Sequence, residues 1–236
     1  MRNRFRLLGL IVGLGVAQNA AAANLLVNGG FEVPVQGPPN FATFNVPAGS
    51  SLITGWNVVQ GNVDLATDAN YGPGNNTLHL TSVQDIDLIG DTNGSGGVFG
   101  GLSQSFATTI GQTYRLTFDY SHNPGTASPT GSYAAQVSVA DGHAPANSIF
   151  SVEVSQANGP APWVGFSKDF IAISDLTLLS LISTRGGFNA GIFLDEVSVD
   201  LVNSAVPVPG ALPLFVSGLA GLGWLAHRRR RKTTAA

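Results

Sequence analysis

The chain has 236 residues, no cysteine and a formal net charge of −3. Between residues 24 and 203 it carries all 14 acidic residues but only three bases, Arg115, Lys168 and Arg185, so this part has a net charge of −11. Nucleic acid is excluded as a partner, because phosphate backbones are bound by clusters of Lys and Arg. Disulfides are excluded too, and about 180 residues can bury a core without them.

Residues 1–23 are predicted to form a secretory signal peptide. Three arginines within the first six residues precede an apolar stretch from Leu7 to Ala17, and small residues end the segment at Ala21–Ala23. This order is typical of a leader that is cleaved after about Ala23. The alternative is a buried N-terminal helix, which the arginines ahead of the apolar run disfavour.

Residues 24–203 are predicted to form one all-β domain. Short alternating or β-branched runs recur every 10–15 residues between Gly, Pro, Asn and Ser clusters, and helical periodicity is almost absent. The expected strands are Asn24–Asn28, Trp56–Gln60, Thr77–Thr81, Ser103–Ala107, Thr113–Ser121, Tyr133–Ala140, Ile149–Val154, Phe166–Ile171, Leu176–Thr184 and Gly191–Leu201. Pro34–Gly49 and Asp85–Gly101 are expected to be long loops. About ten strands in one unit favour a two-sheet sandwich of jelly-roll type.

Glu32 and Asp195 are candidate metal ligands from the two ends of this domain. Glu32 ends the first expected strand, and Asp195 shares the odd register of the last strand with Phe193 and Val197. A carboxylate in a core-facing register must be paired, hydrogen-bonded or metal-bound. First and last strands often lie close together in a sandwich, so both carboxylates could share one calcium ion with backbone carbonyls. The alternative is a β-bulge at Asp195–Glu196 that turns the side chain to solvent, and spacing alone does not choose between the two.

A second acidic stretch, Asp91–Gly96, matches the first half of a calcium-binding loop. Its twelfth position is Leu102, where such a loop needs a bidentate Glu. A flexible glycine-rich loop is therefore the favoured interpretation.

Trp163 and Tyr71 are the candidate ligand-binding aromatics. Trp163 ends Gly159–Trp163, which its prolines and glycine predict to be a loop, where an indole could stack on a sugar ring. An aromatic side chain that caps the end of the sandwich is equally compatible with this position. Trp56 follows Gly55 at the start of an apolar strand and is expected in the core.

Catalytic motifs are poorly represented. The sequence has no nucleophile elbow, no zinc-protease motif, no phosphate-binding or dinucleotide-binding loop and no cysteine nucleophile. His79, His122 and His143 have no recognisable partner spacing and are expected to be structural. We therefore expect a protein that is not an enzyme, with a glycan hydrolase that uses paired carboxylates as the less favoured alternative.

The C-terminal part is predicted to contain a linker at 204–210, a transmembrane helix at 211–226 and a basic cytoplasmic tail at 227–236. Ser217 is the only polar side chain between Val206 and Ala226, and Arg228–Lys232 follow. The positive-inside rule places the basic block in the cytoplasm and the β domain outside. A helix that begins near Pro213 would be about 21 Å long against a hydrocarbon core of about 30 Å, so the anchor is marginal.

This C-terminal region resembles the PEP-CTERM sorting signal of Gram-negative bacteria, which combines a short proline-containing motif, an apolar helix and an arginine-rich stop. The motif here is Val206, Pro207, Val208 and Pro209, with Val208 where the family usually has an acidic residue. The resemblance implies that an exosortase in the inner membrane cuts near the motif. The domain would then reach the cell surface or the extracellular matrix, often in organisms that make exopolysaccharide.

The stretches NLLVNGGFEVP, GWNVVQGNVDL, LSQSFATTIGQTYRLTFDYSHNP and LDEVSVDL resemble the choice-of-anchor C domain over residues 24–202. That domain is similar to the domain of unknown function found in plant cell-wall proteins, and the resemblance implies a galactose-binding-like sandwich. Similar carbohydrate-binding modules often hold a structural calcium, which implies Glu32 and Asp195 as its ligands here. The expected function is a secreted, non-catalytic module that binds or resides in polysaccharide. The alternative is a structural matrix or surface protein without a sugar ligand.

Overall fold

A computed structural model of the chain describes residues 23–35, 44–67, 84–90, 98–125 and 127–202. The chain divides into two units, residues 1–202 and 203–236, and the described residues all belong to the first. The predicted linker, sorting motif, transmembrane helix and basic tail, and the predicted signal peptide apart from Ala23, lie outside the described residues. Within the ranges given above, no helix is long and apolar enough to cross a membrane.

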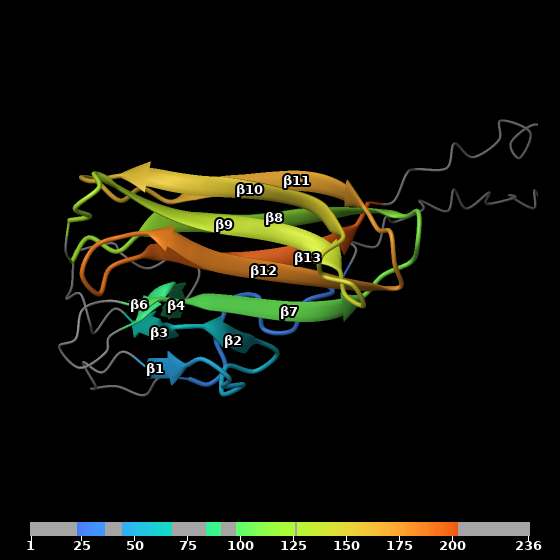
Figure 1. Ribbon diagram of the computed structural model, residues 1–236, viewed down its shortest axis with the longest axis horizontal. Coiled ribbons are helices and arrows are strands. Elements are labelled where there is room, and N and C mark those ends of the chain that lie inside the picture. The colour runs from blue at the N-terminus through green and yellow to red at the C-terminus, as the bar shows by residue number, and fades with distance from the viewer. Residues whose placement is uncertain (1–22, 36–43, 68–83, 91–97, 126, 203–236) are drawn as a thin grey trace, which may run out of the picture. The chain divides into compact units, whose positions relative to one another are not determined.

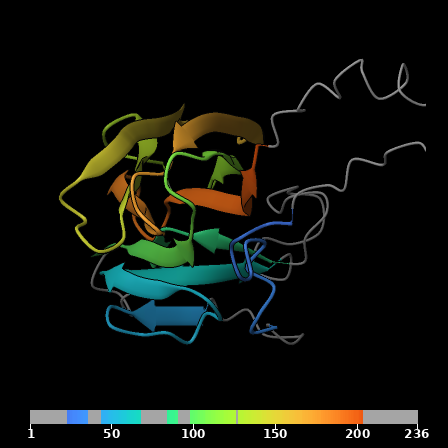
Figure 2. The same ribbon diagram turned by 90° about the vertical axis from the view of Figure 1, so that its right-hand side faces the viewer.

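The described residues form a sandwich of antiparallel sheets (Figure 1). One sheet has six strands in the order β1-β3-β4-β13-β8-β11, and the other has five in the order β10-β9-β12-β7-β2. The strands are β1 (Phe44–Pro47), β2 (Asn57–Gln60), β3 (Asn62–Thr67), β4 (Gln84–Asp87), β5 (Ile89–Gly90), β6 (Val98–Phe99), β7 (Gly101–Ala107), β8 (Thr113–His122), β9 (Ser132–Asp141), β10 (Ser148–Ala157), β11 (Val164–Ile171), β12 (Leu176–Arg185) and β13 (Ile192–Leu201). The pair β5-β6 forms a separate two-stranded ribbon. The edge strand β1 and its partner β3 lie at the bottom of Figure 2.

The core lies between the two large sheets and follows the period-2 alternation of their strands. On β8, the side chains of Tyr114, Leu116 and Phe118 are buried in the core, while that of Arg115 is exposed, as the sequence predicts. The facing positions of the five-stranded sheet come mainly from β9 and β12, with Val137 as an example. The prediction of an all-β sandwich is therefore confirmed for the described residues.

Most of the predicted strands are confirmed, and the errors have identifiable causes. Asn24–Asn28 is not a strand, and Thr77–Thr81 lies outside the described residues. The expected loop at Pro34–Gly49 contains β1, and the one at Asp85–Gly101 contains most of β4, all of β5 and β6, and the first residue of β7. Polar residues in β4 concealed this strand, because burial and pairing with β3 and β13 outweigh local propensity there.

Candidate functional site

The N-terminal segment docks beside β13 through a side chain that replaces part of a strand ladder. Asn24 Nδ2 donates to the Val197 carbonyl at 3.0 Å, and Asn24 Oδ1 accepts from the Val199 amide at 3.0 Å. Backbone hydrogen bonds follow from the Leu25 amide to the Val199 carbonyl and from the Val197 amide to the Gly29 carbonyl. The segment thus supplies hydrogen-bond partners to backbone groups on one side of β13 without being a strand itself. This explains the wrong prediction for Asn24–Asn28.

A tight turn at residues 28–31 brings the segment against β13. Asn28 and Phe31 both have positive φ, at 58° and 54°. A Cβ on Gly29 would lie 1.9 Å from the Val197 carbonyl oxygen, so only glycine fits there. The Phe31 ring packs against Trp56 with centroids 5.2 Å apart, and Trp56 Nε1 donates to the Asn28 carbonyl. Trp56 is buried, which confirms its predicted place in the core.

A β-bulge in β13 determines where Asp195 lies. Leu194 belongs to the core before the bulge and Val197 after it, so the core-facing positions change from even to odd numbers. Asp195 therefore does not share a face with Val197, and the predicted common register is wrong. The alternative prediction of a bulge at Asp195–Glu196 is right about where the bulge lies. It is wrong that the bulge turns Asp195 to solvent, because Asp195 is 0% exposed and Glu196, with φ 50°, is the exposed residue.

Glu32 and Asp195 both border Gly30. A Cβ atom on Gly30 would lie 3.7 Å from Asp195 Oδ1 and 3.9 Å from Glu32 Cγ. Carboxylate and carbonyl oxygens are the ligands that calcium prefers, so the chemistry of these donors fits that ion. Among the described residues, no group of three or more His, Cys, Asp or Glu is arranged to hold a metal. A calcium ion here would therefore also need backbone or water oxygens.

Further carboxylates, which the sequence analysis did not propose as site residues, lie with Asp195 on the outer face of the six-stranded sheet. Asp64 on β3 is directly opposite Asp87 on β4, and Asp195 on β13 is directly opposite Asp119 on β8. Asp64, Asp87 and Asp195 are buried. The alternation Asp85-Ile86-Asp87 was the available signal, since Ile86 faces the core and the two carboxylates point the other way.

Asp87 holds three chain segments together. Its Oδ1 accepts from the amides of Ile89 at 2.9 Å and Gly191 at 3.0 Å, and its Oδ2 accepts from Asn123 Nδ2 at 2.7 Å. Burial raises the pKa of Asp87 well above its ordinary value, and the nearby charge of Asp64 adds to this, while the three hydrogen bonds oppose it. With three donors on one buried carboxylate, Asp87 acts as a structural link.

Trp163 lies directly before β11 in the loop at 158–163, as predicted, and is half-buried. Two side chains fix this loop. Gln156 Nε2 donates to the Pro162 carbonyl at 2.7 Å, and Ser121 Oγ donates to the Ala161 carbonyl at 2.9 Å. The indole is therefore attached to a loop that the sandwich holds in place. Tyr71, the other predicted aromatic, lies outside the described residues.

His122 contacts Gln156, one of the two side chains that hold the Trp163 loop. It is buried, its Nδ1 is 2.8 Å from Gln156 Oε1, and its ring stacks on Tyr133 with centroids 4.3 Å apart. Because Gln156 Nε2 also donates to the Tyr120 carbonyl, the amide links β8, β10 and the Trp163 loop. This agrees with the predicted structural role of His122, while His79 lies outside the described residues.

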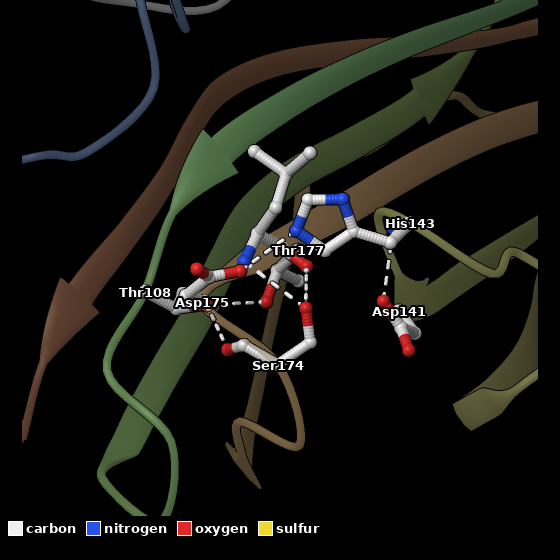
Figure 3. Close-up of polar contacts among 7 residues, drawn as sticks. Thr108, Asp141, His143, Ser174, Asp175 and Thr177 are labelled. Atoms are coloured by element: carbon white, nitrogen blue, oxygen red, sulfur yellow. Dashed lines mark hydrogen bonds and ion pairs between the residues drawn. The ribbon is translucent and has the colours of Figure 1, made fainter.

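The third histidine belongs to a polar network at the other end of the sandwich (Figure 3). His143 Nε2 lies 2.7 Å from Asp175 Oδ1, and both side chains are largely exposed. The His143 amide donates to Asp141 Oδ1, which lowers the pKa of Asp141. The Ser174 hydroxyl donates to the Leu176 carbonyl and accepts from the Leu176 amide. This hydroxyl is engaged in the turn, so the network stabilises connections between strands and does not form a nucleophile–base pair.

The outer face of the five-stranded sheet carries small polar side chains. One row of paired positions crosses all five strands and consists of Ser151, Ser138, Ser180, Ser103 and Asn57. No aromatic side chain occupies an outward-facing position on the described strands of this sheet. An aromatic platform for a ring-shaped ligand must therefore come from the loops, which favours Trp163 over the sheet face.

Comparison with solved structures supports this architecture. The carbohydrate-binding module TmCBM61, solved in complex with β-1,4-galactotriose, aligns at a TM-score of 0.50 and 20% identity over 76% of this chain and 99% of that chain. A CBM4 module aligns at 0.40 and 18% identity over 75% and 99% of the two chains. A xylan-binding CBM22-1 domain of Paenibacillus barcinonensis aligns at 0.39 and 18% identity over 70% and 96%. The likeness to TmCBM61 shows a common fold.

At the level of sequence, curated proteins give no significant match. A family model described as "Protein of unknown function (DUF642)" matches residues 24–199, which is most of the chain and nearly the whole of the β-sandwich. The protein therefore belongs to the DUF642 family.

Proposed function

We propose that this protein is a secreted or surface-associated, non-catalytic module that binds or resides in extracellular polysaccharide. The observation that carries the proposal is the fold shared with TmCBM61, a module solved with a β-1,4-linked galactose oligomer. A galactan-type or other neutral glycan suits a domain with a net charge of −11, because such a ligand brings no anionic groups. The choice-of-anchor C resemblance points in the same direction.

Trp163 is the proposed sugar platform, with Tyr71 as a second contributor. An indole face offers a rigid apolar surface to a pyranose ring. The hydrogen bonds from Gln156 and Ser121 to the Trp163 loop support this role, because a fixed platform loses little conformational freedom on binding. The hydroxyl row of the five-stranded sheet offers no comparable stacking surface.

The test compares two aromatic side chains on different loops, the half-buried Trp163 and the exposed Phe188. Trp163→Ala should weaken binding to polysaccharide at least tenfold in an affinity-gel or glycan-array assay. Phe188→Ala is the matched control, because Phe188 is 50% exposed in the β12–β13 connection and should leave binding unchanged. Equal affinities for both variants and the parent would contradict the assignment of Trp163. No saturable binding to any polysaccharide, including that of the producing organism, would favour a structural matrix protein instead.

Calcium is the proposed structural cofactor, held by Glu32 and Asp195. The ion would neutralise two carboxylates and fasten the N-terminal segment to β13. Chelation with EGTA should lower the melting temperature, and Glu32→Ala or Asp195→Ala should abolish the response to calcium. Glu196→Ala is the control, since Glu196 is the exposed neighbour in the bulge. Identical melting of the calcium-free and calcium-loaded protein would rule out the site.

Export and sorting complete the proposal. The signal peptide at 1–23 would direct the chain across the inner membrane of a Gram-negative bacterium, where the helix at 211–226 holds it. An exosortase would then cut near Val206–Pro209 and pass the domain to the cell surface or the extracellular matrix. Mass spectrometry of the protein recovered from culture tests both processed ends. A mature form that still contains either terminal segment would overturn the corresponding step.

A further inference from the structure

Three isoleucines form an exposed apolar edge at one end of the sandwich. Ile110 is 65% exposed, Ile171 is 57% exposed and Ile173 is 49% exposed. The β7–β8 turn that contains Ile110 is bonded to the chain after β11, because the Gly111 amide donates to the Ala172 carbonyl at 2.8 Å. We call these three residues the isoleucine edge. Exposed hydrophobic side chains that gather in one patch can mark an interaction surface, whereas single ones are common.

The isoleucine edge lies beside the point where the chain leaves the sandwich. The Val202 amide donates to the Thr113 carbonyl, and Thr113 is directly opposite Ile171. Val202, Thr113 and Ile171 therefore form one row across three neighbouring strands. With strands about 4.8 Å apart, Ile171 lies about 10 Å from the exit. Figure 1 shows β11 and β13 both ending at this end of the sandwich.

The chain beyond Val202 limits how far this end can be from a membrane. Eight residues separate Val202 from Ala211, where the predicted transmembrane helix begins. Fully extended, they span at most about 28 Å. The predicted helix then ends at the basic block Arg228–Lys232, which favours the cytoplasmic side. If the predicted helix is in the bilayer, the exit at Val202 can be no farther than about 28 Å from the point where the helix begins.

Two carboxylates next to the isoleucine edge are paired with basic side chains or an imidazole. Arg115 makes a two-point contact with Asp169, two residues before Ile171, and Asp175 is bonded to His143. The domain as a whole carries a net charge of −11. The ion pair of Arg115 and Asp169 beside the isoleucine edge adds no net charge, which limits repulsion from anionic lipids at this point.

We infer that the isoleucine edge docks on the outer surface of the membrane that holds the chain, so that the unprocessed protein sits with this end against the lipid. The partner is a phospholipid bilayer surface, and the inference rests on the proposed membrane anchor. Three isoleucines alone bind a bilayer weakly. The eight residues between Val202 and Ala211 act as a short tether that keeps the isoleucine edge at a high effective concentration near the membrane, so even a weak contact is populated. Docking also keeps the sorting motif, at positions 206–209, close to the membrane in which an exosortase resides.

The absence of cysteine allows a direct test with single labels. The full chain is reconstituted into vesicles of phosphatidylethanolamine and phosphatidylglycerol, and an environment-sensitive fluorophore is attached to Ile171→Cys or, as control, to Phe188→Cys. Phe188 is 50% exposed and precedes β13, at the opposite end from the exit. Spin-labelled lipid should quench the probe at 171 at least twice as strongly as the probe at 188. Adding Ile110→Ser and Ile173→Ser should reduce quenching at 171 to the control level.

Each other outcome overturns the inference. Equal quenching at both labels in chains that float with the vesicles would exclude docking and leave the anchor intact. Chains that do not float with vesicles would overturn the anchor and docking together. A probe at 171 that is shielded only at high protein concentration would assign the edge to a second copy of the chain. A probe shielded at every dilution but not quenched by lipid would assign it to the chain's own tail.

Discussion

The junction where the N-terminal segment and β4 meet β13 differs sharply from the outer edge formed by β10 and β11, although both contain carboxylates. Asp87 at the junction is buried and accepts three hydrogen bonds, whereas Asp169 on β11 is exposed and bonded to Arg115. The carboxylate of Asp87 is thus a buried structural element, whereas that of Asp169 is a solvent-exposed group in a surface ion pair. Burial and the number of donors therefore decide which carboxylates the fold depends on.

Asp87→Ala should produce the largest effect. It removes the acceptor of two buried amides and of Asn123, and each buried donor left without a partner costs about 1–3 kcal/mol. We expect the free energy of unfolding to fall by about 4 kcal/mol in urea titrations. Asp175→Ala is the control, because Asp175 is exposed and should change stability little. Equal losses in the two variants would contradict the distinction between the junction and the surface.

Gly29→Ala should have the next largest effect. The new Cβ would overlap the Val197 carbonyl oxygen, so the N-terminal segment would have to move away from β13. Overpacking of this kind costs about 1–3 kcal/mol, and we expect a value near about 3 kcal/mol. Gly30→Ala provides a matched comparison one residue away, since its Cβ would meet Asp195 Oδ1 at an ordinary 3.7 Å. If both variants unfold at the same urea concentration, the close approach at Gly29 is not the constraint.

These two residues also show what sequence reasoning could and could not reach. The alternation on β8 predicted its buried face, and the order Asn-Gly-Gly-Phe-Glu marked the N-terminal segment as a candidate site. Asp87 was missed because β4 has three polar residues out of four, and only pairing with β3 and β13 makes it a strand. A periodicity count cannot anticipate contacts between residues 36 and 104 positions apart in the sequence, which position Asp87 against Asn123 and Gly191.

The register of Asp195 was wrong for a related reason. Phe193, Val197, Val199 and Leu201 are odd-numbered apolar residues, and Asp195 in the same register allowed either one continuous strand face or a bulge. The interruption is Glu196, which has a positive φ and directly precedes the hydrogen bond from the Val197 amide to the Gly29 carbonyl. Glu32 and Asp195 both border Gly30, because the N-terminal segment lies beside the last strand, and a shared metal ion remains a prediction.

The pH dependence of stability should distinguish the two regions by sign. The pKa of Asp87 is raised on folding, so the native state binds more protons than the unfolded state above the ordinary Asp value of 3.8. Stability should therefore fall as the pH rises from about that value through the folded pKa of Asp87, and then level off. The pKa of Asp169 and that of Asp141 are lowered on folding, so their contributions are lost only as the pH falls below the same value.

Asp87→Asn isolates the junction in this experiment. The variant cannot ionise at position 87. Urea titrations between pH 4 and pH 8 should therefore show no decline of its stability with rising pH, whereas the loss of stability at lower pH should match that of the parent. Its absolute stability should also be lower, because the new amide faces the Nδ2 of Asn123 as a second donor. A decline of unchanged size in Asp87→Asn would mean that another group causes it.

Arg115→Ala should have the smallest effect, although its ion pair with Asp169 is well formed. Both side chains are about half exposed, and water and salt screen the attraction that the short 2.7 Å contact suggests. The hydrogen bonds from Arg115 lower the pKa of Asp169. Arg115→Ala should therefore reduce the stability of the folded state mainly at pH values above the ordinary pKa of Asp and at low salt. Thermal melts at low and high salt measure this, with Lys168→Ala on the neighbouring strand as the control. A loss as large as that of Asp87→Ala would show that burial does not separate the two kinds of carboxylate.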